Sequence, residues 1–92
     1  MQWSVNLSKR VVKALKKLPE NVNASVIALI RDIESRGPVR GNWPNYSRLG
    51  GNRHHCHLKK GKTTYVAIWR VINKEIHIVE VSYVGTHEKA PY

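Results

Sequence analysis

The sequence predicts an α+β fold, in which two N-terminal helices pack on one face of a small antiparallel sheet. Apolar residues recur at helical spacing in the first half of the chain and alternate as in strands in the second half. The turns of the second half are short, and short turns join antiparallel neighbours. We therefore expect strand, helix, helix and then three or four strands (β-α-α-β-β-β), with the helices covering one face of the sheet.

The first half reads as one strand and two amphipathic helices. Residues Gln2–Leu7 alternate apolar and polar side chains, as a half-buried strand does. Ser8 is a suitable N-cap for a helix over Lys9–Leu18, whose lysines lie opposite its apolar stripe. Pro19 suits the first turn of a second helix, which the Gly-Pro pair at 37–38 should end.

The second half reads as a loop followed by a meander of strands. Residues 38–47 are rich in Gly, Pro and Asn, which favour a loop. Tight turns at 60–62 and 73–74 separate the expected strands, which are Arg53–Lys59, Thr63–Ile72 and Glu75–Val84. Since the helices cover one face, the other face is left open, and sheet twist makes it concave. A groove there suits a single strand of nucleic acid.

Composition and charge narrow the class of protein. The 92 residues predict one domain, 1–92, without the apolar stretch of a signal peptide or membrane span. A lone cysteine excludes an intrachain disulfide, so we expect a cytoplasmic protein. The net charge is +10, and no Asp or Glu occurs between Glu34 and Glu75. A positive field of this kind attracts polyanions such as nucleic acids. The alternative is a surface that is basic without binding them, and an acidic protein partner is compatible with polyanion binding.

The expected strand that carries three of the histidines raises the question of a metal site. Strand alternation sends His55 and His57 to one face and His54 and Cys56 to the other. Zinc sites need more ligands than either pair supplies, and no carboxylate accompanies them. We therefore expect neither a metal nor another cofactor.

A metal-free ribonuclease needs a group that takes the 2′-hydroxyl proton, a group that protonates the 5′-oxygen, and cations beside the phosphorane. Histidine suits both proton roles, because its ordinary pKa of about 6.5 lies near neutral pH. His57 and Lys59 share a face of the expected strand, and His87 follows the last strand, near Tyr92. We expect these residues to converge at one end of the open face. The remaining histidines are interpreted as packed or solvated: His54, His55 and His77.

Several segments of the chain resemble the RelE/ParE toxin superfamily: Arg48-Leu49-Gly50-Gly51, Cys56-His57-Leu58-Lys59, Tyr65–Val71 and Val84–Lys89. The order of the N-terminal elements agrees, so the resemblance spans nearly the whole chain, and it is closest to the histidine-using YafQ-like branch. It implies a microbial-RNase-like fold and the toxin of a type II toxin–antitoxin system. Such a toxin is an endoribonuclease (mRNA interferase) that enters the ribosomal A site, cuts messenger RNA without metal and inhibits translation.

The resemblance also implies residue roles. His57 matches the family's strand histidine, His87 the histidine near the C-terminus, and Tyr92 the last aromatic residue. We expect His57 as general base, His87 as general acid and Tyr92 as a group that stacks on or orients the substrate. Lys59 and Arg53 would supply the cations. Contacts with RNA or the ribosome are expected from Arg48, Lys60, Lys62, Arg70, Lys13, Lys16 and Lys17.

The expected partners are messenger RNA, ribosomal RNA and a cognate antitoxin, whose acidic and apolar residues would wrap the toxin. No membrane partner is expected. Two other functions stay open at this point. A ParE-like toxin has the same fold but inhibits DNA gyrase, which would make His57 and His87 dispensable. A non-enzymatic RNA-binding domain would need only the basic surface.

Overall fold

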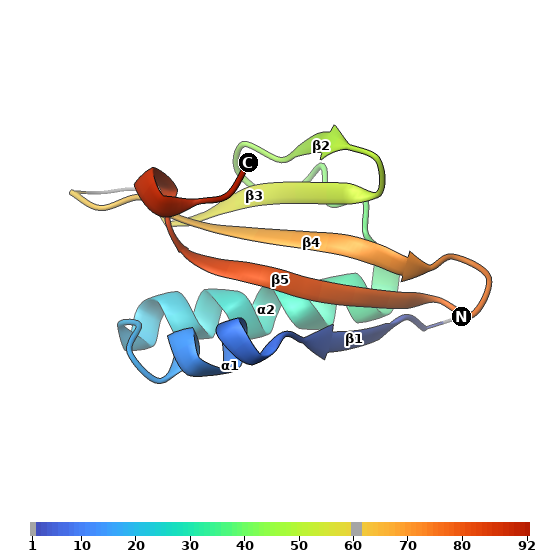
Figure 1. The fold of residues 1–92 in the computed structure, drawn as a ribbon, viewed down its shortest axis with the longest axis horizontal. Helices are drawn as coiled ribbons and strands as arrows, with labels where there is room; N and C mark the ends of the chain where they lie inside the picture. The colour runs from blue at the N-terminus through green and yellow to red at the C-terminus, as the bar shows by residue number, and fades with distance from the viewer. Residues whose placement is uncertain (1, 60–61) are drawn as a thin grey trace.

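The computed structural model describes residues 2–59 and 62–92. Two helices cover one face of a five-stranded sheet (Figure 1). The predicted α+β class is therefore confirmed. Among the described residues, no helix is both long and apolar enough to cross a membrane. The elements are β1 Ser4–Leu7, α1 Lys9–Leu15, α2 Glu20–Arg36, β2 Ser47–Gly50, β3 Arg53–Lys59, β4 Tyr65–Asn73, β5 Ile78–Thr86 and a short 3₁₀ helix η1 His87–Lys89.

The helices begin and end close to the residues that the sequence marks. The Ser8 hydroxyl accepts a hydrogen bond from the Val11 N–H (3.2 Å) and caps α1 as expected. The helix α1 is shorter than predicted, and its end leads into a turn. Pro19 is the N-cap of α2 and does not lie in its first turn. Gly37 ends α2 with a φ of 93°, a conformation that glycine adopts without strain.

The sheet has the order β1-β5-β4-β3-β2. The four C-terminal strands are antiparallel, as predicted, but β1 pairs parallel to β5, so the sheet is mixed. The short turns between the later strands predict that these strands are antiparallel. Two helices follow β1, so no short turn predicts its direction in the sheet. The strand β5 starts at Ile78 and not at Glu75, because the Asn73 side chain accepts hydrogen bonds from the N–H groups of Glu75 and Ile76 (3.0 and 3.1 Å) and holds a turn there.

The main core lies between the sheet and the helices. It contains Leu29 and Ile33 of α2 and the fully buried Trp69 of β4. In β3, Cys56 and Leu58 face this core. His55 and His57 lie on the open face, so the predicted alternation is observed from Arg53 to Leu58.

A smaller apolar cluster lies on the open face of the sheet. It consists of Val66, Ile68 and Tyr83, with Leu49 and Ala90 packed against it. Ala90 belongs to the C-terminal tail, which crosses this face after η1 (Figure 1). The helices therefore leave the face open, and the tail covers part of it.

Candidate active site

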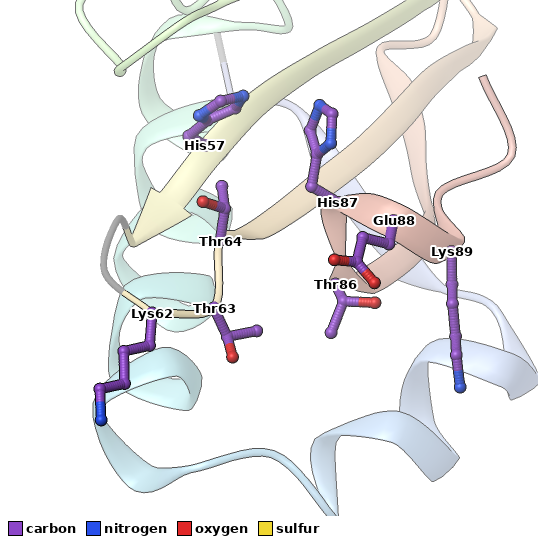
Figure 2. Close-up of a pocket in the computed structure, with 8 residues that line it drawn as sticks. All are labelled: His57, Lys62, Thr63, Thr64, Thr86, His87, Glu88 and Lys89. Carbon is purple, nitrogen blue, oxygen red and sulfur yellow. The ribbon is translucent and has the colours of Figure 1, made fainter.

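A pocket of about 430 Å³ lies at one end of the sheet, where His57 of β3 and His87 of η1 approach each other (Figure 2). It lies between the end of β3, the residues that lead into β4, and η1. Its lining residues are His57, Lys62, Thr63, Thr64, Thr86, His87, Glu88 and Lys89. Within the described part of the chain, the pocket thus combines imidazole, ammonium and hydroxyl groups with one carboxylate, that of Glu88.

The rings of His57 and His87 lie together at this pocket, with their centroids 5.6 Å apart and an interplanar angle of 72°. The alternation of β3 brings His57 to the open face. The N–H of His87 donates to the carbonyl oxygen of Thr64 (2.8 Å), which ties the start of η1 to the residues that precede β4. The structure thus brings together the two histidines that were expected to share the site.

The ring of Tyr92 lies close to the two histidine rings of the candidate site and to a third, that of His55. Its ring centroid is 5.4 Å from that of His87 and 5.2 Å from that of His55. Burial raises the pKa of the Tyr92 hydroxyl, and nearby Tyr83 adds to the rise. The phenol therefore stays neutral and remains able to donate a hydrogen bond near neutral pH.

His55 also belongs to this group, although sequence reasoning interpreted it as packed or solvated. Its Nδ1 lies 2.9 Å from the Ser47 Oγ of the edge strand β2, and its ring lies 6.1 Å from that of His57. The signal was present in the sequence, because strand alternation already put His55 on the face of His57.

Arg53 contacts the tail and not the pocket. Its guanidinium donates to the carbonyl oxygen of Pro91 (3.3 Å), next to Tyr92. Arg53 was expected beside the scissile phosphate, but it does not line the pocket. The contact instead restrains the segment that carries the terminal aromatic ring.

The structure does not place Lys59 on the face of His57. The register of β3 with β4 shifts between these two residues, so that Lys59 lies opposite Tyr65. Tyr65 packs against the helix-side core, and residues that are directly opposite share a face. A bulge of this kind interrupts alternation, and Lys59 does not line the pocket.

Among the described residues, the cations that line the pocket are Lys62 and Lys89. Lys62 was expected among the binding residues, whereas Lys89 was missed, although it stands close to His87 in the sequence. Arg70 lies on β4 and forms an ion pair with Glu80 (3.3 Å).

The other expected contact residues lie outside the pocket. Arg48 is on the edge strand β2 and is exposed. Three exposed lysines lie on or just after α1 and do not line the pocket: Lys13, Lys16 and Lys17. Lys60 lies outside the described residues.

Two further residues of β3 are structural. His54 is buried, its ring stacks on that of Trp69 (5.8 Å), and its Nδ1 lies 2.7 Å from the Tyr46 hydroxyl. Burial lowers the pKa of His54, and the charge of Arg48 lowers it further. Burial also raises the pKa of the Cys56 thiol to about 12, so it is not a nucleophile at neutral pH.

His77 was expected on the solvent side of a strand, but it lies half-buried in the β4–β5 turn, where its ring stacks on that of Trp3 at 4.2 Å. Within the ranges that the structure describes, no three His, Cys, Asp or Glu side chains form a group that could hold a metal ion.

Comparison with known proteins gives a match in structure only. No protein-family model and no curated protein sequence matches the chain. A mutant of the E. coli toxin RelE in the free state superposes with a TM-score of 0.75 at 20% identity, covering 98% of this chain and 88% of that one. A chain of the archaeal RelE–RelB complex from Pyrococcus horikoshii OT3 gives 0.70 at 20% identity, with coverages of 98% and 100%. The fold is that of RelE.

A third similar structure supports the same conclusion. A chain of the toxin–antitoxin complex RelBE2 from Mycobacterium tuberculosis gives a TM-score of 0.68 at 21% identity, covering 95% of this chain and 100% of that one. The RelE fold therefore extends over nearly the whole chain. The pocket lies where β3 ends, β4 begins and β5 passes into η1.

Proposed function

We propose that this protein is the toxin of a type II toxin–antitoxin system and cleaves messenger RNA in the ribosomal A site without a metal ion. The observation that supports this most is the pair His57 and His87, whose ring centroids lie 5.6 Å apart at a pocket lined by Lys62 and Lys89. Two imidazoles at this separation can reach two oxygens of one phosphodiester, and the lysines can balance its charge.

In the proposed reaction, His57 takes the proton from the 2′-hydroxyl, whose oxygen then attacks the adjacent phosphorus. The bond between phosphorus and the 5′-oxygen breaks, and His87 gives a proton to that oxygen. The products are a 2′,3′-cyclic phosphate and a 5′-hydroxyl. Lys62 and Lys89 would stabilise the negative charge of the phosphorane, the role that the sequence suggested for Lys59 and Arg53.

The C-terminal tail would supply a substrate-binding group, Tyr92. Tyr92 would stack on the substrate or orient it, since its ring lies beside both His55 and His87. A pair of histidines followed by a terminal aromatic ring favours the YafQ-like branch within the superfamily. The exposed lysines on and after α1, which do not line the pocket, would contact ribosomal RNA.

An antitoxin partner follows from the same comparison. RelE of P. horikoshii was crystallised with RelB, and E. coli RelBE and M. tuberculosis RelBE2 are likewise toxin–antitoxin complexes. For this chain we propose a cognate antitoxin with acidic and apolar residues, because a net charge of +10 favours an acidic partner. Action on the ribosome would place the toxin in the cytoplasm.

The test is an assay with purified ribosomes that carry a defined message. Wild-type protein should cut the message at A-site codons in the presence of a chelator and leave 2′,3′-cyclic phosphate ends. A ParE-like toxin would leave the message intact and inhibit supercoiling by gyrase. An RNA-binding domain would retain the message on a filter without cutting it. Either of these results would reject the proposal.

A further inference from the structure

The strand β5 has two neighbours along one edge, first β1 and then the start of α1 (Figure 1). The parallel pairing of β1 with β5 stops at Leu7, opposite Val81. One residue further along β5, the Ser82 carbonyl oxygen accepts from two side chains, the Ser8 hydroxyl (3.4 Å) and the Arg10 guanidinium (3.0 Å). Side chains at the start of α1 thus satisfy the edge of the sheet where the strand β1 no longer does.

The Arg10 side chain also reaches the open face of the sheet. Its Cζ lies 5.4 Å from the centroid of the Tyr83 ring, and Tyr83 belongs to the open-face cluster. A guanidinium within about 6 Å of an aromatic centroid is attracted by the electrons of the ring. One side chain of the helix layer therefore contacts the face of the sheet on which His57 lies.

The hydroxyl of Tyr83 holds the end of β5. It donates to the carbonyl oxygen of Thr86 (2.8 Å), the residue that precedes His87. A Cβ at Gly85 would lie 2.6 Å from this hydroxyl oxygen, so the glycine leaves room for the bond. The His87 N–H donates in turn to the carbonyl oxygen of Thr64 (2.8 Å). Two hydrogen bonds thus fix the backbone that carries the His87 imidazole, and one of them depends on Tyr83.

The Tyr83 ring can hold Thr86 only while it keeps its orientation. Its apolar neighbours in the cluster, Val66 and Ile68, give contacts that have no preferred direction. The guanidinium of Arg10 is different, because its hydrogen bond to the Ser82 carbonyl fixes it at the edge of the sheet. Loss of Arg10 leaves the ring with its apolar contacts alone, so the end of β5 should open more often.

We propose that Arg10 is a positioning residue for the candidate site: it holds the Tyr83 ring, whose hydroxyl fixes the backbone that carries His87. The effect of Arg10 on cutting rests on the ribonuclease function proposed above, whereas its effect on the His87 backbone can be measured without any cleavage. Arg10 acts through Tyr83 and takes no part in proton transfer.

Amide hydrogen exchange of the free protein, followed by NMR, tests this link. In Arg10→Ala the His87 amide should exchange about fivefold faster than in wild type, the scale expected for the loss of an exposed cation–π contact. Lys9→Ala is the matched control, because it removes a positive charge from the neighbouring exposed position of α1. The His87 amide should exchange in Lys9→Ala at the wild-type rate.

The variant Tyr83→Phe shows whether the link runs through the hydroxyl. Phenylalanine keeps a ring beside Arg10 but cannot donate to the Thr86 carbonyl. In this background, Arg10→Ala should change the exchange rate of the His87 amide by less than about twofold, because the two residues act in one chain of contacts. A general loss of stability would instead raise the exchange rate equally in both backgrounds, and that result would overturn the proposal.

Cutting on ribosomes that carry a defined message gives the second measurement. At saturating protein, Arg10→Ala should cut about fivefold more slowly than wild type and keep the wild-type half-saturating concentration, as expected for a group that acts on positioning and not on RNA binding. A raised half-saturating concentration with an unchanged maximal rate would overturn the proposal, and so would wild-type exchange of the His87 amide in Arg10→Ala. If exchange responds as expected but the wild-type protein cuts no message, the role of Arg10 stands and the ribonuclease function fails.

Discussion

The rings of His57 and His87 meet nearly edge to face at 5.6 Å, although the strand β4 lies between the strand that carries His57 and the strand that precedes His87. This contact exists because the chain turns back after β5. The His87 N–H is held by the Thr64 carbonyl, and the following residues cross the open face. The candidate site therefore depends on how the tail is anchored as much as on the two imidazoles.

Replacement of Arg53 tests that anchoring. Arg53→Ala removes the hydrogen bond to the Pro91 carbonyl, and we expect about a tenfold loss of cutting. If Arg53 acts by positioning the tail, the double variant Arg53→Ala/Tyr92→Ala should lose little more than Tyr92→Ala alone. Rates of single-turnover cleavage measure this. If the fold loss in the double variant equals the product of the losses in the two single variants, Arg53 acts independently of the tail.

The lysines of the pocket should carry the salt dependence of RNA binding. Replacing Lys62 or Lys89 by Ala removes a cation from the pocket lining and should reduce the slope of log affinity against log salt by about one each. Lys59→Ala is the matched control, because Lys59 lies outside the pocket, and it should change cutting much less. A larger loss of cutting in Lys59→Ala than in Lys89→Ala would restore the assignment suggested by the sequence.

A substitution at Gly85 tests whether the packing of Tyr83, in the open-face cluster, helps to position His87. A Cβ at Gly85 would lie 2.6 Å from the Tyr83 hydroxyl oxygen, which itself donates to the Thr86 carbonyl (2.8 Å). Gly85→Ala should lower the free energy of unfolding by about 1–3 kcal/mol, as overpacking does, and should reduce cutting because the segment before His87 must move. Adding Tyr83→Phe removes the clashing oxygen and should restore part of the stability. Urea unfolding measures both, and the absence of any rescue would argue against this contact.

Asp32 should make stability depend on acid pH. Burial acts to raise its pKa, but hydrogen bonds from Trp43, Asn42 and Arg40, together with the Arg40 charge, lower it to about 2 from the ordinary 3.8. Because the folded-state pKa is depressed, the contribution is complete above about pH 4 and is lost as the pH falls to about 2. The shift corresponds to about 2 kcal/mol. Asp32→Asn should lower the unfolding free energy at pH 7 and flatten its dependence between these pH values, as urea titrations at several pH values would show.

Much of the fold could be predicted because local patterns specify it. The Ser8 cap, the helical spacing of Leu29 and Ile33, and the glycine at the end of α2 act through neighbouring residues, so the sequence alone indicates them. The direction of β1 could not be predicted, because its pairing with β5 joins distant parts of the chain.

The residues of the candidate site could also be predicted only in part. Strand alternation predicts the side chain of His57 on the open face, as observed. It does not predict the register shift between His57 and Lys59, because no residue pattern in the sequence indicates that shift. Lys89 and Glu88 reach the pocket because η1 turns there, and a tail without a periodic pattern gives no sign of this. The carbonyl acceptor of Arg53 likewise becomes visible only once the tail is in place.

Cleavage by the histidine variants tests the central claim most directly. On ribosomes that carry a defined message, His57→Ala and His87→Ala should each cut at least about a hundredfold more slowly than wild type, as expected for the loss of a general acid or base. His77→Asn is the control, since His77 lies in the β4–β5 turn with a φ of 56°, a conformation that Asn tolerates, and it should cut at the wild-type rate. Wild-type rates in both His57→Ala and His87→Ala, with all variants folded, would contradict the account.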